Sequence, residues 1–312
     1  MPDTLNKIYH PDKISLREVG LRDGLQMVAQ FPSTDARKRW ISEEYAAGIR
    51  HFEVGSFLPK VGYPAFADVE ILVDYAGDIN NLHSVALCPN LRGAKNALKS
   101  KVAELTCVVS ASEAHNLANL NRYQKQTLDE IAMVCGLRDK THHRPLISVG
   151  IAMSFGCSIS GNVEPGEVVD IAAKCFESGV DMVWLADTVG YAGPKQVEHL
   201  IDRVRGSLGD QPIGIHLHDT RGLGLANASA ALNAGVRALD ASLGGLGGCP
   251  FVPNATGNIV MEDLAFLCQK EGFETGIDIE ALVAVRRILE TEMPAEILYG
   301  GYAKAGSPRI IP

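Results

Sequence analysis

The chain has 312 residues, of which 46% are hydrophobic and 21% charged, and its formal net charge is −8 at pH 7. This composition is close to that of globular proteins, and no apolar run approaches the roughly 20 residues that cross a bilayer. The acidic balance excludes a surface built to neutralise phosphates. We therefore expect neither a nucleic-acid nor a membrane partner, and we favour a small-molecule substrate.

Eight short apolar runs recur along the chain and predict strands. They are Ile14–Val19, His51–Phe57, Leu82–Cys88, Ala103–Val109, Leu146–Met153, Asp181–Ala186, Pro212–Leu217 and Ala238–Leu243. Between them lie segments with helical spacing, several of which open with Ser, Thr, Asp or Pro and close with Gly: Asp35–Ala47, Leu128–Leu137, Pro165–Ser178, Pro194–Leu208 and Leu223–Ala234. Strands that are apolar on both faces and alternate with helices predict a (β/α)₈ TIM barrel of the α/β class. An open doubly wound sheet is the alternative.

The length would allow two domains of about 150 residues, but no linker rich in glycine, proline or serine divides the first 270 residues. We expect one TIM-barrel domain over residues 1–312, with the barrel at about 13–270 and a short C-terminal helical extension at about 271–312. Two further helices are predicted at Ile259–Cys268 and Ile279–Glu290. The tail at Pro294–Pro312 is predicted to be irregular structure over the barrel rim.

The seven cysteines are too sparse for a disulfide scaffold and include no C-x-x-C pair. This indicates a reducing compartment and no zinc finger. The segment from Met1 to Asp12 has no apolar core of a signal peptide and carries acidic residues that a transit peptide avoids. We therefore expect a cytoplasmic protein.

Two histidines, His216 and His218, stand at the end of a predicted strand and precede Asp219 and Thr220. Residues at i and i+2 of a strand project to the same side, so both imidazoles converge inside the mouth of the barrel. This spacing indicates a pair of metal ligands rather than two histidines packed in a core. With oxygen donors from Asp and Asn plus water, Mg²⁺ or Mn²⁺ fits better than zinc.

A second candidate site is the turn Arg22-Asp23-Gly24, which directly follows the first predicted strand. It could be a structural turn with an internal ion pair. In the functional interpretation, Asp23 is a metal ligand and Arg22 stabilises an anion.

The third candidate is a glycine-rich loop, in which four of the five residues from Gly244 to Gly248 are glycine and Cys249 follows. Such a sequence fits a loop that moves or approaches a ligand closely, and it places the thiol in an exposed position. A surface loop with an incidental thiol is the alternative. The dinucleotide-binding fingerprint is excluded because its strand–helix spacing and acidic residue are missing.

Polar groups also stand at the ends of two other predicted strands, Glu53 and Ser56 on the second and Asp187 and Thr188 on the sixth. Carboxylates in such positions can simply cap the next helix. Polar residues at the C-terminal ends of several strands are nevertheless typical of a TIM-barrel active site.

These motifs together resemble the 3-hydroxy-3-methylglutaryl-coenzyme A lyase family, within the wider group of metal-dependent lyase and Claisen-type synthase barrels. The resemblance runs from about Ile14 to Ile279, and its most specific element is Gly245–Phe251 with Asn258 downstream. It implies a divalent cation, Mg²⁺ or Mn²⁺, held by Asp23, His216, His218 and Asn258. It also implies that Arg22 faces a thioester carbonyl and that Cys249 donates or accepts a proton. Supporting or substrate-contacting positions are matched by Gln26, Glu53, Ser56, Asp187 and Thr188.

The chemistry of such a lyase suits these residues. Cleavage of a 3-hydroxyacyl-CoA thioester between C2 and C3 removes the hydroxyl proton, breaks the bond and leaves an acetyl-CoA enolate. We expect Asp187 or Asp23 to accept the proton, Arg22 to stabilise the enolate oxygen, and Cys249 to protonate the enolate carbon. The expected partner is the acyl-CoA substrate, and a homodimer or homotetramer is considered.

Departures from the family pattern leave the acyl group open. Met27, Val28 and Ala29 stand where the family usually has Asn-Glu-Lys, and Arg221 and Leu223 where it has Tyr and Gln. The substrate is expected to be 3-hydroxy-3-methylglutaryl-CoA, which yields acetyl-CoA and acetoacetate. The alternative is a related thioester such as citramalyl-CoA, which yields acetyl-CoA and pyruvate.

Three other functions are less favoured. A Claisen-type synthase usually continues the histidine pair with Asn-Asp and lacks the Gly-Gly-Cys-Pro loop. A biotin carboxyltransferase barrel shares the histidine motif but has no use for the cysteine. A non-enzymatic binding module would require the loss of a catalytic position, and every position carried over is present.

Overall fold

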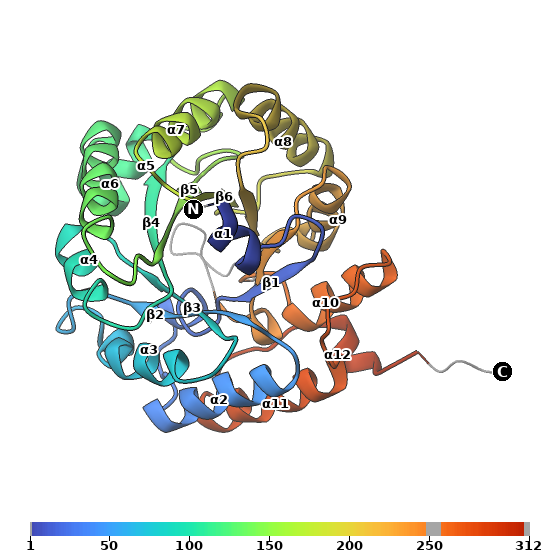
Figure 1. The fold of residues 1–312 in the computed structure, drawn as a ribbon. Helices are drawn as coiled ribbons and strands as arrows, with labels where there is room; N and C mark the ends of the chain where they lie inside the picture. Colours follow the sequence, from blue (N-terminus) through green and yellow to red (C-terminus); the bar gives the residue numbers. More distant parts are fainter. Residues whose placement is uncertain (1, 248–256, 309–312) are drawn as a thin grey trace.

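The protein forms a closed barrel of parallel strands surrounded by helices, seen along the barrel axis in Figure 1. The computed structural model describes residues 2–247 and 257–308. The strands follow each other around the ring in chain order: β1 (Ser15–Glu18), β2 (His51–Ser56), β3 (His83–Leu87), β4 (Glu104–Ser110), β5 (Leu146–Ala152), β6 (Met182–Asp187), β7 (Ile213–Leu217) and β8 (Ala238–Ala241). All eight predicted strands are confirmed, and the pairing of β1 with β8 closes the ring.

The outer layer consists of helices that connect successive strands. The helices between β1 and β8 are α2 (Thr34–Ala46), α3 (Val69–Gly77), α4 (Leu91–Ala97), α5 (Glu113–Leu120), α6 (Gln124–Arg138), α7 (Pro165–Glu177), α8 (Pro194–Leu208) and α9 (Gly224–Asn233). Sequence signals mark where several of these helices begin. The Ser33 side chain accepts a hydrogen bond from the Ala36 amide at the start of α2, and α7 and α8 each begin with a proline. The helices α3, α4 and α5 were not predicted from the sequence.

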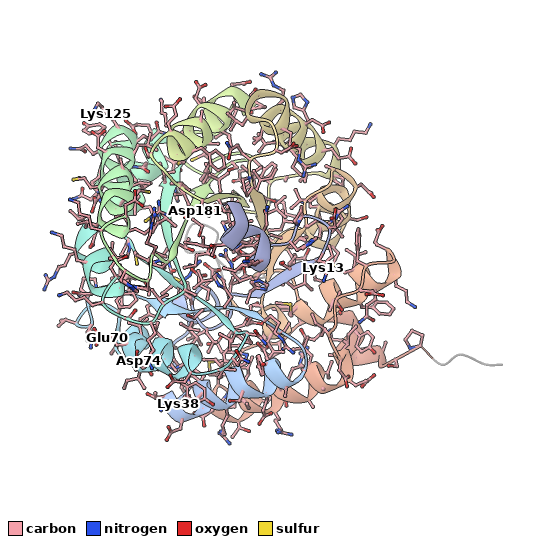
Figure 2. All side chains as sticks on the ribbon, in the orientation of Figure 1. Lys13, Lys38, Glu70, Asp74, Lys125 and Asp181 are labelled. Atoms are coloured by element: carbon pink, nitrogen blue, oxygen red, sulfur yellow. The ribbon has the colours of Figure 1, made fainter. Side chains whose placement is uncertain are left out.

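Burial explains why strands form where the apolar runs lie. Every residue of β2 and of β6 is buried, because side chains on one face fill the barrel and those on the other pack against the helices. Many charged side chains lie on the outside, and Figure 2 shows Lys38, Glu70, Asp74 and Lys125 on the surrounding helices. Among the described residues, no helix is long and apolar enough to span a membrane.

The N-terminal end of the barrel is covered by α1 (Pro2–Ile8), a helix that the sequence did not predict (Figure 1). Tyr9, just after α1, donates a hydrogen bond from its hydroxyl to Glu104 at 2.8 Å, and its ring stacks on His51. His83 and Ser148 also hydrogen-bond to Glu104. At this end of the barrel interior, beneath α1, Tyr9, His83 and Ser148 are therefore all paired with Glu104.

The C-terminal part of the described chain contains α10 (Met261–Lys270), α11 (Ile279–Glu292) and α12 (Gly301–Ala305). The prediction of a wholly irregular tail was wrong, because α12 lies within it. The tail is held by backbone and side-chain bonds: the Tyr299 amide donates to the Gly244 carbonyl at 2.7 Å, and Asp263 accepts from the amides of Gly301 and Tyr302. It thus fixes the start of the glycine-rich segment.

Candidate active site

The predicted ligands gather at the C-terminal ends of β1 and β7. Asp23 lies in the turn after β1, where its amide donates to the Val19 carbonyl. His216 lies within β7, and His218 follows the strand directly. The spacing of i and i+2 brings the two histidine rings to the same side, with centroids 5.0 Å apart.

The three side chains form one cluster that could hold a metal ion. One ligand atom from each of Asp23, His216 and His218 lies within 4.8 Å of the others. The two histidine Nε2 atoms are 3.1 Å apart, and His218 Nε2 is 3.6 Å from Asp23 Oδ2. Such an approach of two ring nitrogens and a carboxylate is typical of a metal-ligand set.

Asn258 completes this cluster from the segment after the glycine-rich loop. It pairs with His218 in an isolated β-bridge, and its Nδ2 donates to Asp23 Oδ2 at 2.9 Å. Its Oδ1 is buried and has no hydrogen-bond partner within the described residues. At Gly247, where φ is +115°, an added Cβ would lie 2.9 Å from Asn258 Nδ2, so glycine permits this close packing. An amide oxygen without a partner beside a carboxylate and two imidazoles fits a divalent cation.

Electrostatics shifts the pKa of two of these groups, and in opposite directions. Burial would raise the pKa of Asp23, but the adjacent Arg22 and the two histidines hold it well below its usual value. Asp23 therefore stays ionised. Burial would lower the pKa of His216, but the hydrogen bond and charge of Asp240, together with Asp23, raise it.

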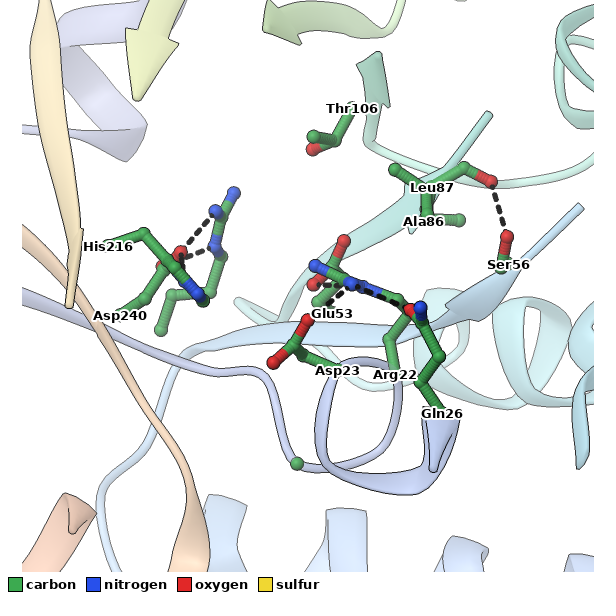
Figure 3. Close-up of polar contacts among 12 residues, drawn as sticks. Arg22, Asp23, Gln26, Glu53, Ser56, Ala86, Leu87, Thr106, His216 and Asp240 are labelled. Atoms are coloured by element: carbon green, nitrogen blue, oxygen red, sulfur yellow. Dashed lines mark hydrogen bonds and ion pairs between the residues drawn. The ribbon is translucent and has the colours of Figure 1, made fainter. Parts of the chain in front are cut away.

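Arg22 lies beside the cluster and is held by two carboxylates. Its Nη1 donates to Asp23 at 2.6 Å, and its Nε lies 2.8 Å from Glu53 Oε2. Figure 3 shows the guanidinium between Asp23 and Glu53, with Gln26 beside it. Within the turn, Asp23 is the one acidic neighbour of Arg22 in the sequence. The structure adds a second, fully buried partner, Glu53 of β2.

These groups open onto a cavity of about 220 Å³ at the barrel mouth. Arg22, Asp23, His216 and His218 line it together with Gln26 and Thr188. Its deeper wall consists of small and aromatic residues from the strands, namely Thr106, Gly150, Ala152, Trp184 and Ala186. The cavity thus joins the charged groups of the ligand cluster to a wall of strand residues.

Three other predicted residues, Glu53, Ser56 and Asp187, do not line the cavity in which a substrate would bind. Glu53 and Ser56 are fully buried and do not line the cavity; Ser56 donates to the Leu87 carbonyl at 3.3 Å. Asp187 accepts hydrogen bonds from the amides of Tyr191 and Ala192, at 2.8 and 3.1 Å, and burial raises its pKa. Both carboxylate oxygens of Asp187 thus bind amides of the loop before α8, and because the N-cap of that helix is Gly193, Asp187 holds the loop and does not cap the helix.

The predicted cysteine, Cys249, lies outside the described residues. The other six cysteines are all buried: Cys88, Cys107, Cys135, Cys157, Cys175 and Cys268.

The sequence interpretation missed several polar residues that line the same cavity, among them Arg17 of β1, His115 of α5 and Asp240 of β8. His115 is buried, and burial lowers its pKa to about 4. A signal for the other two existed, because a charged residue inside a strand that is buried on both faces is uncommon and needs a partner.

Comparisons with known proteins agree with this geometry. A family model described as HMGL-like matches residues 13–289. The chain is 33% identical to a hydroxymethylglutaryl-CoA lyase of Bacillus subtilis, over 91% of this chain and 94% of that protein. It is 35% identical to an (R)-citramalyl-CoA lyase of Chloroflexus aurantiacus, over 88% of this chain and 89% of that one.

A solved structure extends the likeness to three dimensions. It is that of an HMG-CoA lyase from Acinetobacter baumannii in complex with coenzyme A and 3-methylmalate. The two structures superpose with a TM-score of 0.88 at 35% identity, covering 97% of this chain and 99% of the other. The family match across most of the barrel, and the ligand cluster at its mouth, lead to one conclusion: the chain belongs to the HMGL-like family and is a carbon–carbon lyase.

Proposed function

We propose that this chain cleaves the C2–C3 bond of a 3-hydroxy-3-methyl diacyl-CoA, with 3-hydroxy-3-methylglutaryl-CoA as substrate and acetyl-CoA and acetoacetate as products. One observation carries the proposal: Arg22 and Asp23 bring a fixed positive charge and a member of the ligand cluster to the same cavity. The relative that binds coenzyme A supports an acyl-CoA substrate.

The cation site is proposed to comprise Asp23, His216, His218 and Asn258. Two imidazoles and two oxygen donors, with room for water in the cavity, suit Mg²⁺ or Mn²⁺. When bound, the cation would polarise the tertiary hydroxyl of the substrate and lower its pKa.

The remaining steps of the reaction are assigned to side chains of the protein. Asp23 lines the cavity, whereas both oxygens of Asp187 bind backbone amides, so we assign the hydroxyl proton to Asp23. As the C3 hydroxyl becomes a ketone, the electron pair of the C2–C3 bond passes to the thioester and forms an enolate. Arg22, fixed by Glu53, is placed to stabilise the enolate oxygen. Cys249 stays the proposed proton donor to C2 on the strength of the sequence.

A second substrate is supported by a specific comparison. The citramalyl-CoA lyase of Chloroflexus aurantiacus is as similar to this chain as the hydroxymethylglutaryl-CoA lyases are. Citramalyl-CoA presents the same tertiary hydroxyl beside a shorter diacyl group, so the same residues would cleave it to acetyl-CoA and pyruvate.

The test is an assay of the purified protein, freed of metal and reloaded with Mg²⁺ or Mn²⁺, with both thioesters. Mass spectrometry follows acetyl-CoA, and acetoacetate or pyruvate identifies the substrate that is cleaved. His218→Ala is the matched control for background cleavage. If neither thioester releases acetyl-CoA above this control, the proposed function is wrong.

A further inference from the structure

Below the ligand cluster, an arginine and an aspartate face each other across the seam of the barrel. Arg17 of β1 and Asp240 of β8 are register partners, and each is 3% exposed. Arg17 Nε donates to Asp240 Oδ1 at 2.7 Å, and its Nη2 donates to Oδ2 at 2.8 Å. This fork geometry fixes the plane of the carboxylate.

Asp240 has a third contact, which points up to the cluster. Its Oδ2 lies 3.0 Å from Nδ1 of His216 (Figure 3), and Nε2 of the same ring lies 3.1 Å from Nε2 of His218. By contrast, His218 Nδ1 is buried and has no hydrogen-bond partner within the described residues. The two imidazoles of the cluster are therefore oriented by different means.

The chemistry of the carboxylate determines where the proton of His216 lies. A carboxylate only accepts hydrogen bonds, so Nδ1 of a neutral imidazole must carry the N–H that faces Asp240. Nε2 then carries the lone pair, which is the form that binds a cation.

Arg17 keeps the carboxylate in the orientation that this contact requires. Its guanidinium lies over the ring of Trp184, 3.6 Å from the ring centroid, and it is also 3.4 Å from Glu104. The arginine is thus held on its face by an aromatic ring and on its edge by two carboxylates. Without it, Asp240 would be a buried charge free to turn away from His216.

We propose that Asp240, held by Arg17, is a positioning residue that fixes His216 in the Nδ1–H tautomer and so keeps Nε2 free for the divalent cation. The proposal rests on the cation site of the proposed function and extends it to residues below the site. It separates Asp240 from an ordinary buried ion pair, because such a pair would contribute to stability and leave metal affinity unchanged.

The test is Asp240→Asn, measured on the full-length protein without any thioester. An asparagine replaces one of the two oxygens with an NH₂ group, so either Arg17 Nε or the pair of Arg17 Nη2 and His216 Nδ1 loses its acceptor. We expect Mn²⁺ affinity, measured by isothermal titration calorimetry, to fall about 10- to 100-fold. In the metal-free protein, ¹⁵N NMR of the imidazoles should show the His216 proton on Nδ1 in the wild type and a changed tautomer in the variant. A His216→Gln variant assigns the signal.

The matched control is Glu104→Gln. Glu104 is an equally buried carboxylate that also contacts Arg17, but it bonds to Tyr9, His83 and Ser148 rather than to His216. This variant should lose stability in urea unfolding and bind Mn²⁺ within about twofold of the wild type. Asp240→Asn with unchanged Mn²⁺ affinity and an unchanged tautomer would overturn the proposal.

A second variant applies if Asp240→Asn does not fold. Arg17→Lys keeps the charge but replaces the fork with a single point contact. It should lower Mn²⁺ affinity by a smaller factor and broaden or shift the His216 signals, and values equal to wild type would overturn the proposal. Wild type that binds Mn²⁺ but cleaves no thioester would contradict the proposed function alone, whereas wild type that binds no cation would overturn both.

Discussion

The two ends of the barrel interior differ in how their polar groups are satisfied. At the N-terminal end, Tyr9, His83 and Ser148 all bond to Glu104, and α1 covers them. At the C-terminal end, His218 Nδ1, Thr220 Oγ1 and Asn258 Oδ1 are buried without partners within the described residues. Unpaired buried groups cost stability, so these three groups at the mouth of the barrel mark a place where a ligand can supply the missing partners.

This contrast divides the molecule by role. A paired network holds the barrel together, and an incompletely paired one is prepared for binding and catalysis. Substitutions at the two ends should therefore change different quantities, stability at one end and turnover at the other.

The largest expected effect is at the open end. His218→Ala removes one of the two imidazoles of the cluster, so metal-dependent turnover should fall by at least about 10³-fold, or about 4 kcal/mol. Steady-state kinetics with bound-metal analysis measures this. His51→Gln, a histidine change at the closed end, is the control and should keep its turnover. A His218→Ala enzyme with near-normal, cation-dependent rates would contradict the ligand assignment.

Arg22→Gln should have the next largest effect. Loss of a fixed charge facing a developing enolate lowers kcat by about 10²- to 10³-fold, with KM changed by less than about threefold. The control is Arg37→Gln, since Arg37 is a buried arginine that pairs with Asp68 in the outer layer, away from the cavity. A rise in KM with kcat unchanged would assign Arg22 to substrate anchoring instead.

The closed end should respond to pH through His51. Burial lowers its pKa to about 3, against about 6.5 in an unfolded chain. At a pH between these two values, the unfolded chain binds a proton on His51 that the folded protein does not bind. The contribution of neutral His51 to the unfolding free energy is therefore complete above pH 6.5 and falls by about 1.4 kcal/mol per pH unit below it. Urea unfolding at pH 7, 6 and 5 should show a shallower decline for His51→Gln. Parallel curves for the two proteins would disprove this role.

The smallest effect is expected for Tyr9→Phe. The ring can still stack on His51, and Glu104 keeps its other partners, so one buried hydrogen bond is lost. The unfolding free energy should fall by about 1 kcal/mol, while kcat and Mn²⁺ affinity stay at wild-type values. A change in kcat would show that the two ends are coupled.

The strands could be predicted from the sequence because burial on both faces leaves continuous apolar runs. The helices α4 and α5 could not, because each has only 7 or 8 residues and packing rather than periodicity defines them. The helix α1 could not be predicted for a related reason, since it is stabilised by the barrel end that it covers.

The site was predictable where neighbouring residues act together. His216 and His218 share one strand end, so their convergence follows from strand geometry. The partnership of Arg17 with Asp240, or of Arg22 with Glu53, depends on which strands lie side by side and on which way each side chain points. Such pairs join residues that are far apart in the chain, and the sequence alone does not show that they lie close together in space.

The pairing of β1 with β8 has a consequence for folding. Arg17 and Asp240 are separated by 223 positions in the chain and meet only when the ring closes. Contacts between such distant segments form slowly, since the chain entropy between them is lost before the contact is gained. In a refolding experiment, high-affinity Mn²⁺ binding should therefore appear with barrel closure and after the secondary structure, which makes the cation a reporter of the last step in assembly.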